Sequence, residues 1–146
     1  MTVIAWDGKT LAADKRATSH GHPATTTKIR RLADGSLIAM SGDADAGREL
    51  AHWYESGANP NTFPGNRTSD DRCRCILMIV TPDRKVHMLQ RTAYLVSFED
   101  PFVAMGSGRD AALAVMHMGG DARKAVEIAG LVDVDCGNGI DTLELE

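Results

Sequence analysis

Several features that would assign this chain to a class early are absent from it. No apolar run is long enough to cross a bilayer, and the first residues lack the basic start and long apolar stretch of a signal peptide. The formal net charge is -4, without the basic excess that nucleic-acid binders usually carry. We therefore expect a cytoplasmic protein with neither a membrane nor a nucleic acid as its partner.

Cysteine is also scarce, with 3 residues in the chain. An odd number in a chain without a secretion signal favours free thiols over a disulfide framework. Cys73 and Cys75 share one face of an expected strand, but no second cysteine pair exists to complete a metal site. His20 and His22 likewise have no third ligand nearby in the sequence. Buried small residues and a solvated loop are the favoured interpretations of these two pairs.

The sequence does contain enough apolar residues to form one core. The 146 residues are 43% hydrophobic and 25% charged, and they show no repeat or linker, so we expect a single domain over 1–146. Asp7-Gly8 is a strong hairpin signal between strands at 2–6 and 9–14. Asp34-Gly35 similarly separates strands at 28–32 and 36–41. The polar segment 15–27 between these two hairpins is expected to be a loop.

Helical spacing then replaces the strand pattern. Asp43 is a good N-cap for a helix that ends at Gly57, and Asp121 caps another with Ala122, Ala125, Val126 and Ala129 on one stripe. A further helix is expected over 110–118, and the polar stretch 58–71 is expected to be a loop. Additional strands are predicted at 73–80, 85–90, 92–96, 102–105 and 141–146. The pattern predicts an α+β fold whose helices cover mainly antiparallel sheets.

Thr2 is the residue whose position suggests chemistry. Met1 is normally trimmed when the next residue is small, and trimming would leave Thr2 with a free α-amino group and a β-hydroxyl. A threonine hydroxyl is a weak nucleophile until a base accepts its proton, and an α-amine with a pKa of about 7.7–8.0 suits that role at neutral pH. A nearby cation, a carboxylate that orients it and a backbone N–H for the oxyanion would complete such a centre.

Five stretches of the chain resemble, in order, proteasome β-type subunits and the bacterial HslV peptidase family. They are LAADKRAT, TTKIRRL, SLIAMSGDADAGRELAHWYE, FVAMGSGRDAALA and AVEIAGLVDVDCGNGIDTLEL. Each match is weak alone, but together they span nearly the whole chain. The resemblance implies a four-layer αββα sandwich of the N-terminal-nucleophile (Ntn) hydrolase type, with two sheets face to face and helices outside.

The resemblance also implies a role for individual residues. Thr2 would be the nucleophile and its own base, Lys28 the active-site lysine, and Asp14 the acid that orients it. The N–H of Gly42 would bind the oxyanion. The remaining implied positions are Ser107 near the terminal amine, Asp133 as a supporting acid, and a cation site on backbone carbonyls of Gly130, Asp133 and Cys136. No cofactor is required for the chemistry, and Na⁺ or Mg²⁺ is the implied structural cation.

The chain departs from the family between its first helix and the following strands. Family members usually carry a second long helix there, whereas NPNTFPGNRTSDD cannot form one. The helical layer is therefore expected to be reduced, as in short relatives from bacteriophage and prophage genomes. In the family, a stacked ring confers specificity and an ATPase supplies unfolded chains. The resemblance implies a homo-oligomer and allows an ATPase partner. A ring, a smaller oligomer and no assembly at all stay open as alternatives.

These observations predict a threonine-type peptidase that cleaves peptides or unfolded proteins. Each implied residue also has a purely structural interpretation: Gly42 could serve only a tight turn, and Ser107 could cap a helix. Two alternatives to this peptidase remain, a structural subunit and an amidase. If Met1 is retained, the nitrogen of Thr2 is an amide and the chain would be a catalytically silent structural or scaffold subunit of this fold. The other alternative is an amidase that acts on small molecules.

Overall fold

The computed structural model describes residues 1–64 and 75–146. Within them the chain forms strands, three α-helices and one short 3-10 helix, in an order that alternates hairpins with helices. The strands are β1 (Ile4–Trp6), β2 (Thr10–Asp14), β3 (Arg16–Ser19), β4 (His22–Thr25), β5 (Ile29–Arg31), β6 (Leu37–Gly42), β7 (Cys75–Val80), β8 (Val86–Leu89), β9 (Val96–Phe98), β10 (Val103–Met105) and β11 (Ile140–Glu144). The helices are α1 (Ala44–Glu55), η1 (Pro60–Thr62), α2 (Arg109–His117) and α3 (Ala122–Val132).

Two antiparallel sheets face each other across the central core. One has the order β10-β1-β2-β11 and the other β5-β6-β7-β8-β9. Because side chains alternate along a strand, Ile4 and Trp6 of β1 face the second sheet, whereas Val3 and Ala5 face the helices behind. The two faces of β1 thus belong to two separate apolar cores.

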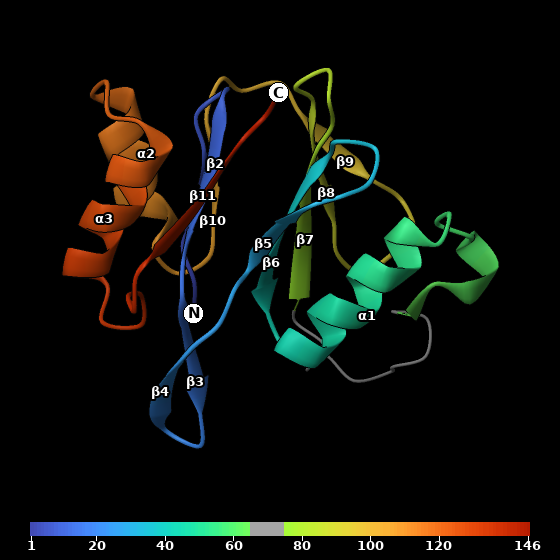
Figure 1. Cartoon of the computed structure of the whole chain (residues 1–146), viewed down its shortest axis with the longest axis horizontal. Helices are drawn as coiled ribbons and strands as arrows, with labels where there is room; N and C mark the ends of the chain where they lie inside the picture. The colour runs from blue at the N-terminus through green and yellow to red at the C-terminus, as the bar shows by residue number, and fades with distance from the viewer. Residues whose placement is uncertain (65–74) are drawn as a thin grey trace.

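Helices cover the outer face of each sheet, so the molecule has four layers in the order αββα (Figure 1). α2 and α3 pack on the first sheet through α3's stripe of small residues. That stripe is the predicted one: Ala122, Ala125, Val126 and Ala129. α1 covers the second sheet with Leu50, Ala51 and Trp53. The predicted α+β sandwich is confirmed.

The caps of α1 and α3 are also as predicted. Asp43 accepts hydrogen bonds from the N–H groups of Asp45 (3.0 Å) and Ala46 (3.2 Å), and Asp121 accepts one from Lys124 (2.8 Å). Beyond α1, the described part of the polar stretch contains η1 and no α-helix, and its remaining residues, 65–71, lie outside the described part of the chain. α1 and η1 are therefore the helices described on that side, which fits a reduced helical layer.

The prediction of a loop over 15–27 is wrong. β3 and β4 form an antiparallel hairpin there, which projects beyond the sheets near the N-terminus (Figure 1). His20 and Gly21 both have positive φ (51° and 81°), as a tight two-residue hairpin turn requires. The hairpin has no apolar face, since β4 is exposed throughout. Its sequence therefore lacks the alternation of apolar and polar residues that would have predicted a strand. Asn138 stabilises it from a distance of more than 100 residues, donating to Ala24 O and Thr25 Oγ1, both at 3.1 Å.

A second correction concerns the strand predicted at 92–96. The strand is β9, Val96–Phe98, because the residues opposite β8 are Val96, Ser97 and Phe98. Cys73 and residue 74, the predicted start of β7, lie outside the described residues. Among the described residues, no helix is both long and apolar enough to cross a membrane.

Candidate active site

Thr2 lies immediately before β1 and is almost completely buried, at 4% exposure. Its hydroxyl Oγ1 accepts a hydrogen bond from Lys28 Nζ at 3.0 Å and donates one to the carbonyl oxygen of Met1 at 2.7 Å. Its backbone nitrogen, an amide while Met1 is attached, donates to Ser107 Oγ at 3.3 Å. Both groups that the predicted chemistry needs on this residue therefore have fixed neighbours.

Asp14 is positioned by the first hairpin. The Asp7-Gly8 turn pairs β1 with β2 in a register that places Ile4 opposite Ala13, so Asp14 lies beside Val3. Asp14 Oδ1 accepts the Val3 N–H at 3.0 Å and the Lys28 ammonium at 2.7 Å. Oδ2 accepts the N–H groups of Arg16 (3.2 Å) and Gly137 (3.0 Å). Four donors therefore stabilise a carboxylate that is 1% exposed.

Lys28 connects the two sheets. It lies just before β5, and its carbonyl accepts the Met40 N–H at 3.0 Å, which continues the pairing of β5 with β6. From this second sheet its side chain reaches Thr2 and Asp14 on the first sheet. The cation that the sequence placed near the nucleophile is therefore brought there by sheet packing.

Ser107 reaches the site through a turn that requires glycine. β10 pairs with β1, and Gly106 follows with a φ of 89°. A Cβ on Gly106 would lie 2.0 Å from the carbonyl oxygen of Thr2, so only glycine lets the two backbones come this close. The N–H of Gly108 donates to that same carbonyl at 3.2 Å. The turn thus holds both the backbone of Thr2 and the hydroxyl of Ser107 in place.

Asp133 and Cys136 lie beside Ser107. The Cys136 thiol lies 3.8 Å from Ser107 Oγ and donates to Asp133 Oδ2 at 3.4 Å. Hydrogen bonding by Ser107, and secondly by the Asp135 N–H, lowers the pKa of Asp133. The Ser107 hydroxyl also contacts the Thr2 nitrogen and the Cys136 thiol. Burial raises the pKa of Cys136 to about 11, with the Asp14 charge adding to the effect. At neutral pH, Cys136 is therefore an uncharged S–H donor to an ionised Asp133.

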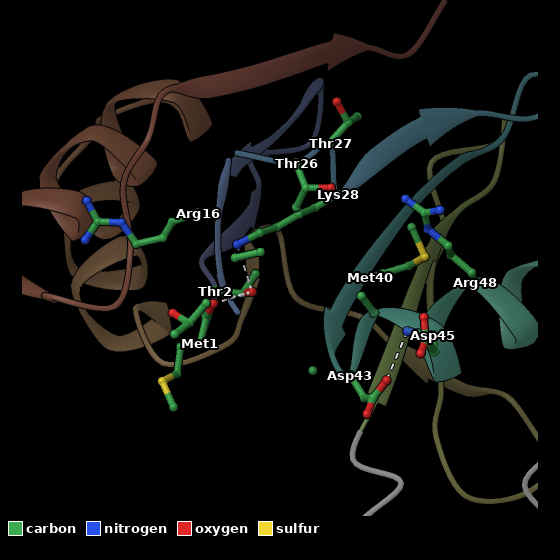
Figure 2. A pocket seen from close by; sticks show the side chains of 14 residues that line it. Met1, Thr2, Arg16, Thr26, Thr27, Lys28, Met40, Asp43, Asp45 and Arg48 are labelled. Atoms are coloured by element: carbon green, nitrogen blue, oxygen red, sulfur yellow. Dashed lines mark hydrogen bonds between the residues drawn. The ribbon is translucent and has the colours of Figure 1, made fainter. Parts of the chain in front are cut away.

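Gly42 borders the pocket into which Thr2 opens. The pocket has a volume of about 380 Å³, and Thr2, Lys28, Gly42 and Arg48 are among its lining residues (Figure 2). Gly42 ends β6 with a φ of 104°, directly before the N-cap of α1. A substrate carbonyl beside Thr2 Oγ1 would therefore lie in a pocket that Gly42 also lines.

The implied cation site lies around the end of α3. Gly130 is in the last turn of that helix, and the carbonyl of Asp133 accepts the Cys136 N–H at 3.1 Å, which leaves that oxygen a second lone pair. Carbonyl oxygens are suitable ligands for Na⁺ or Mg²⁺. Among residues 1–64 and 75–146, no group of three or more His, Cys, Asp or Glu side chains could hold a metal. A cation bound by these carbonyls stays a prediction.

The structure thus brings Thr2, Asp14, Lys28 and Ser107 into direct contact and places Gly42 in the same pocket. Sequence reasoning missed the Gly137 N–H, which donates to Asp14. The run Cys136 to Gly139 contains two glycines and an asparagine, which marks a turn, but nothing in it indicates a donor to residue 14. It also missed Arg48, whose place on the pocket depends on how α1 lies against β6.

We compared the sequence and the structure with those of known proteins. No family model and no curated protein matches the sequence. Solved structures match along the whole chain. HslV from Trypanosoma brucei superposes with a TM-score of 0.73 and 23% identity over 99% of this chain and 98% of that chain.

The chain has the proteasome-like Ntn-hydrolase fold. Thiobacillus denitrificans BPH in complex with epoxomicin matches at a TM-score of 0.71 and 22% identity, over 100% of both chains. The Gly-1 mutant of Anbu from Hyphomicrobium sp. strain MC1 matches at 0.74 and 13% identity, over 100% of this chain and 82% of that one. At such low identities the likeness establishes the Ntn-hydrolase fold and leaves the activity to be argued from the site.

Proposed function

We propose that this protein is a threonine-type amide hydrolase that cleaves peptides with Thr2, after loss of Met1 exposes its amine. The observation that supports this most is the position of Lys28 Nζ, 3.0 Å from Thr2 Oγ1 and 2.7 Å from Asp14 Oδ1. A buried ammonium beside a hydroxyl stabilises the alkoxide form of that hydroxyl. A threonine with a purely structural role would not need a buried ammonium beside its hydroxyl.

The proposed reaction begins with proton transfer within one residue. The free amine of Thr2 accepts the proton of Oγ1 while Oγ1 forms a bond with the substrate's carbonyl carbon. The tetrahedral intermediate collapses, the carbon–nitrogen bond breaks, and the departing amine takes the proton. Water then hydrolyses the ester on Oγ1, and the proton of Oγ1 is restored.

The neighbours of Thr2 have proposed roles in these steps. Lys28 stabilises the developing negative charge on Oγ1, and Asp14 keeps the Lys28 ammonium in place. Ser107 accepts a hydrogen bond from the Thr2 nitrogen and orients it, with Asp133 and Cys136 fixing the Ser107 hydroxyl in turn. The N–H of Gly42 binds the oxyanion, a contribution worth about 3 kcal/mol in other acyl-transfer enzymes.

A second candidate function, a catalytically silent scaffold subunit, is favoured if Met1 stays attached to the chain. With Met1 attached, Oγ1 donates to the Met1 carbonyl, and the Thr2 nitrogen is an amide that cannot accept a proton. Such a chain would be a silent scaffold subunit. Intact-mass measurement of the native protein discriminates the two, because retention of Met1 on every chain would rule out the hydrolase.

Partners are proposed on the same basis. The substrates are peptides or unfolded proteins, and the chain is proposed to assemble with copies of itself, a ring being one such assembly. Native mass spectrometry would measure the number of copies. An ATPase that delivers unfolded chains is a further proposal, and co-purification under ATP from the original cells would test it.

The test of the activity uses protein that has lost Met1. We expect it to cleave fluorogenic peptides, a Thr2→Ser variant to retain part of the rate, and Thr2→Ala to lose at least about 100-fold. Because epoxomicin binds Thiobacillus denitrificans BPH, it is a suitable probe, and it should add its mass to the wild type and not to Thr2→Ala. Equal cleavage by Thr2→Ala would overturn the proposal, and cleavage of small amides alone would identify an amidase instead.

A further inference from the structure

A second cavity, the far cavity, adjoins the pocket beside Thr2. This cavity has a volume of about 320 Å³ and lies over β5, β6 and α1. Its lining residues are Thr27, Ile29, Arg30, Met40 and Arg48. Thr27, Met40 and Arg48 line both spaces, so the two adjoin. Met40 and Arg48 therefore border the space that is open to a side chain held next to Thr2.

Two apolar side chains line these cavities. Met40 lines both of them, and Ile29 lines the far cavity. Gly47 lets α1 pack closely on Met40, because a Cβ there would lie 3.3 Å from the Cβ of Met40. Figure 2 shows the Met40 and Arg48 side chains next to each other, Met40 from β6 and Arg48 from α1.

Most of the cations around this pocket already have a partner. Lys28 pairs with Asp14, and Arg30 pairs with Glu55. The Arg16 guanidinium donates to Asn138 Oδ1 (3.0 Å) and the Val134 carbonyl (2.7 Å), and so is fixed away from the far cavity. Arg48 differs from all three.

Arg48 has no hydrogen bond or ion pair with any residue in 1–64 or 75–146. Its guanidinium thus borders the pocket without an ion-pair partner among those residues. The acids on the same helix lie nearer its start: Asp43 is occupied as the N-cap, and Asp45 is in the first turn, where the helix dipole favours a negative charge. Both line only the pocket next to Thr2, whereas Arg48 also lines the far cavity.

We propose that Arg48 makes this site selective for an acidic residue on the acyl side of the cleaved bond. This inference rests on the proposed function, since Thr2 bonds to the carbonyl carbon of that residue and brings its side chain to the pocket. A glutamate fits the arrangement because its methylenes can lie on Met40 while its carboxylate accepts hydrogen bonds from Arg48, whose planar fork matches a carboxylate. A lysine at the same position meets an unpaired like charge.

The experiment measures binding and cleavage separately. Four fluorogenic peptides differ only at the residue before the scissile bond, which is Glu, Gln, Leu or Lys. Cleavage is measured with protein lacking Met1, and binding of the uncleaved peptides is measured with Thr2→Ala by fluorescence anisotropy. We expect Glu to exceed Gln by about fivefold and Lys by more, in both measurements, because Arg48 is partly solvated.

Three variants assign the effect to one guanidinium. Arg48→Met should bring the Glu-to-Gln ratio close to one, and Arg48→Glu should make Lys preferred over Glu. Arg30→Met is the matched control: it removes a cation from the same cavity, but one already paired with Glu55, so the ratio should change by less than about twofold.

Each outcome separates this inference from the proposed function. Cleavage that is fastest after Leu or Lys, or a Glu-to-Gln ratio that survives Arg48→Met, overturns the inference and leaves the hydrolase intact. Glu-selective binding to Thr2→Ala without any cleavage by the wild type supports the pocket's selectivity and overturns the hydrolase.

Discussion

The ammonium nitrogen of Lys28 lies 2.7 Å from Oδ1 of Asp14, and the two side chains are only 8% and 1% exposed. Lys28 comes from the edge of one sheet and Asp14 from the end of a strand in the other. Their ion pair therefore joins the two sheets as well as positioning a cation beside Thr2. Burying two charges is costly unless each is fully hydrogen-bonded, and Asp14 satisfies this condition with three backbone N–H donors in addition to Lys28.

Removing the two partners should have unequal effects on stability. Lys28→Met leaves Asp14 with its three backbone donors, and we expect the free energy of unfolding to fall by about 3 kcal/mol. Asp14→Ala also leaves three buried N–H groups and the ammonium without an acceptor, so its cost should be larger, about 5 kcal/mol. Urea unfolding followed by circular dichroism measures both. A smaller loss for Asp14→Ala than for Lys28→Met would contradict this account of the pair.

Gly106→Ala should disrupt the active centre through the backbone. The new Cβ would lie 2.0 Å from the Thr2 carbonyl oxygen, at a φ of 89°, so the turn or the first residues must move. We expect a loss of more than about 3 kcal/mol and of peptide cleavage together. Gly21→Ala is the matched control, because it has a φ of 81° but nothing within 4 Å, and it should cost only about 1 kcal/mol and preserve cleavage. Equal losses in the two variants would show that φ alone, and not contact with Thr2, determines the effect.

The pH dependence of cleavage should reveal the terminal amine as the base. An α-amine has a reference pKa of about 7.7–8.0. The amine must be neutral to accept the Oγ1 proton, so kcat/KM should rise with pH through about pH 8 and then reach a plateau. The measurement is a pH profile from 5 to 9 on protein without Met1, and Thr2→Ser should show the same acid limb. A rate that falls as pH rises from 6 to 8 would mean that another group is the base.

Cys136 should make the protein less stable in alkali. Its folded pKa of about 11 lies above the ordinary value of 9.0, so between these values the folded state retains a proton that the unfolded state has lost. The stabilisation is therefore complete below pH 9 and disappears as pH rises toward 11. Urea unfolding at pH 8 and pH 10.5 should show a decline that is smaller in Cys136→Ser, since a serine hydroxyl does not titrate in this range. An identical decline in both proteins would assign the alkaline loss to other groups.

The local signals in the sequence predicted much of the fold. Asp7-Gly8 and the capping residues Asp43 and Asp121 act within a few residues of their partners, so their pattern alone indicates where a strand turns or a helix begins. The resemblance to proteasome-like chains added the arrangement into four layers. The hairpin of β3 and β4 escaped prediction because its stability comes from Asn138, far along the chain, and not from a buried face of its own.

The sequence by itself determined which groups are available for the proposed chemistry: a hydroxyl and a nitrogen on Thr2, a cation, a carboxylate, and glycines where the backbone must turn sharply. Only the tertiary structure decided that they meet. Ser107 is 105 residues from Thr2, and Lys28 reaches Asp14 from the opposite sheet. The position of Arg48 beside Met40 was likewise decided by the packing of α1 on β6. Contacts of this kind depend on how layers pack, because a side chain's distant neighbours are set by the burial of whole faces and not by the residues beside it in sequence.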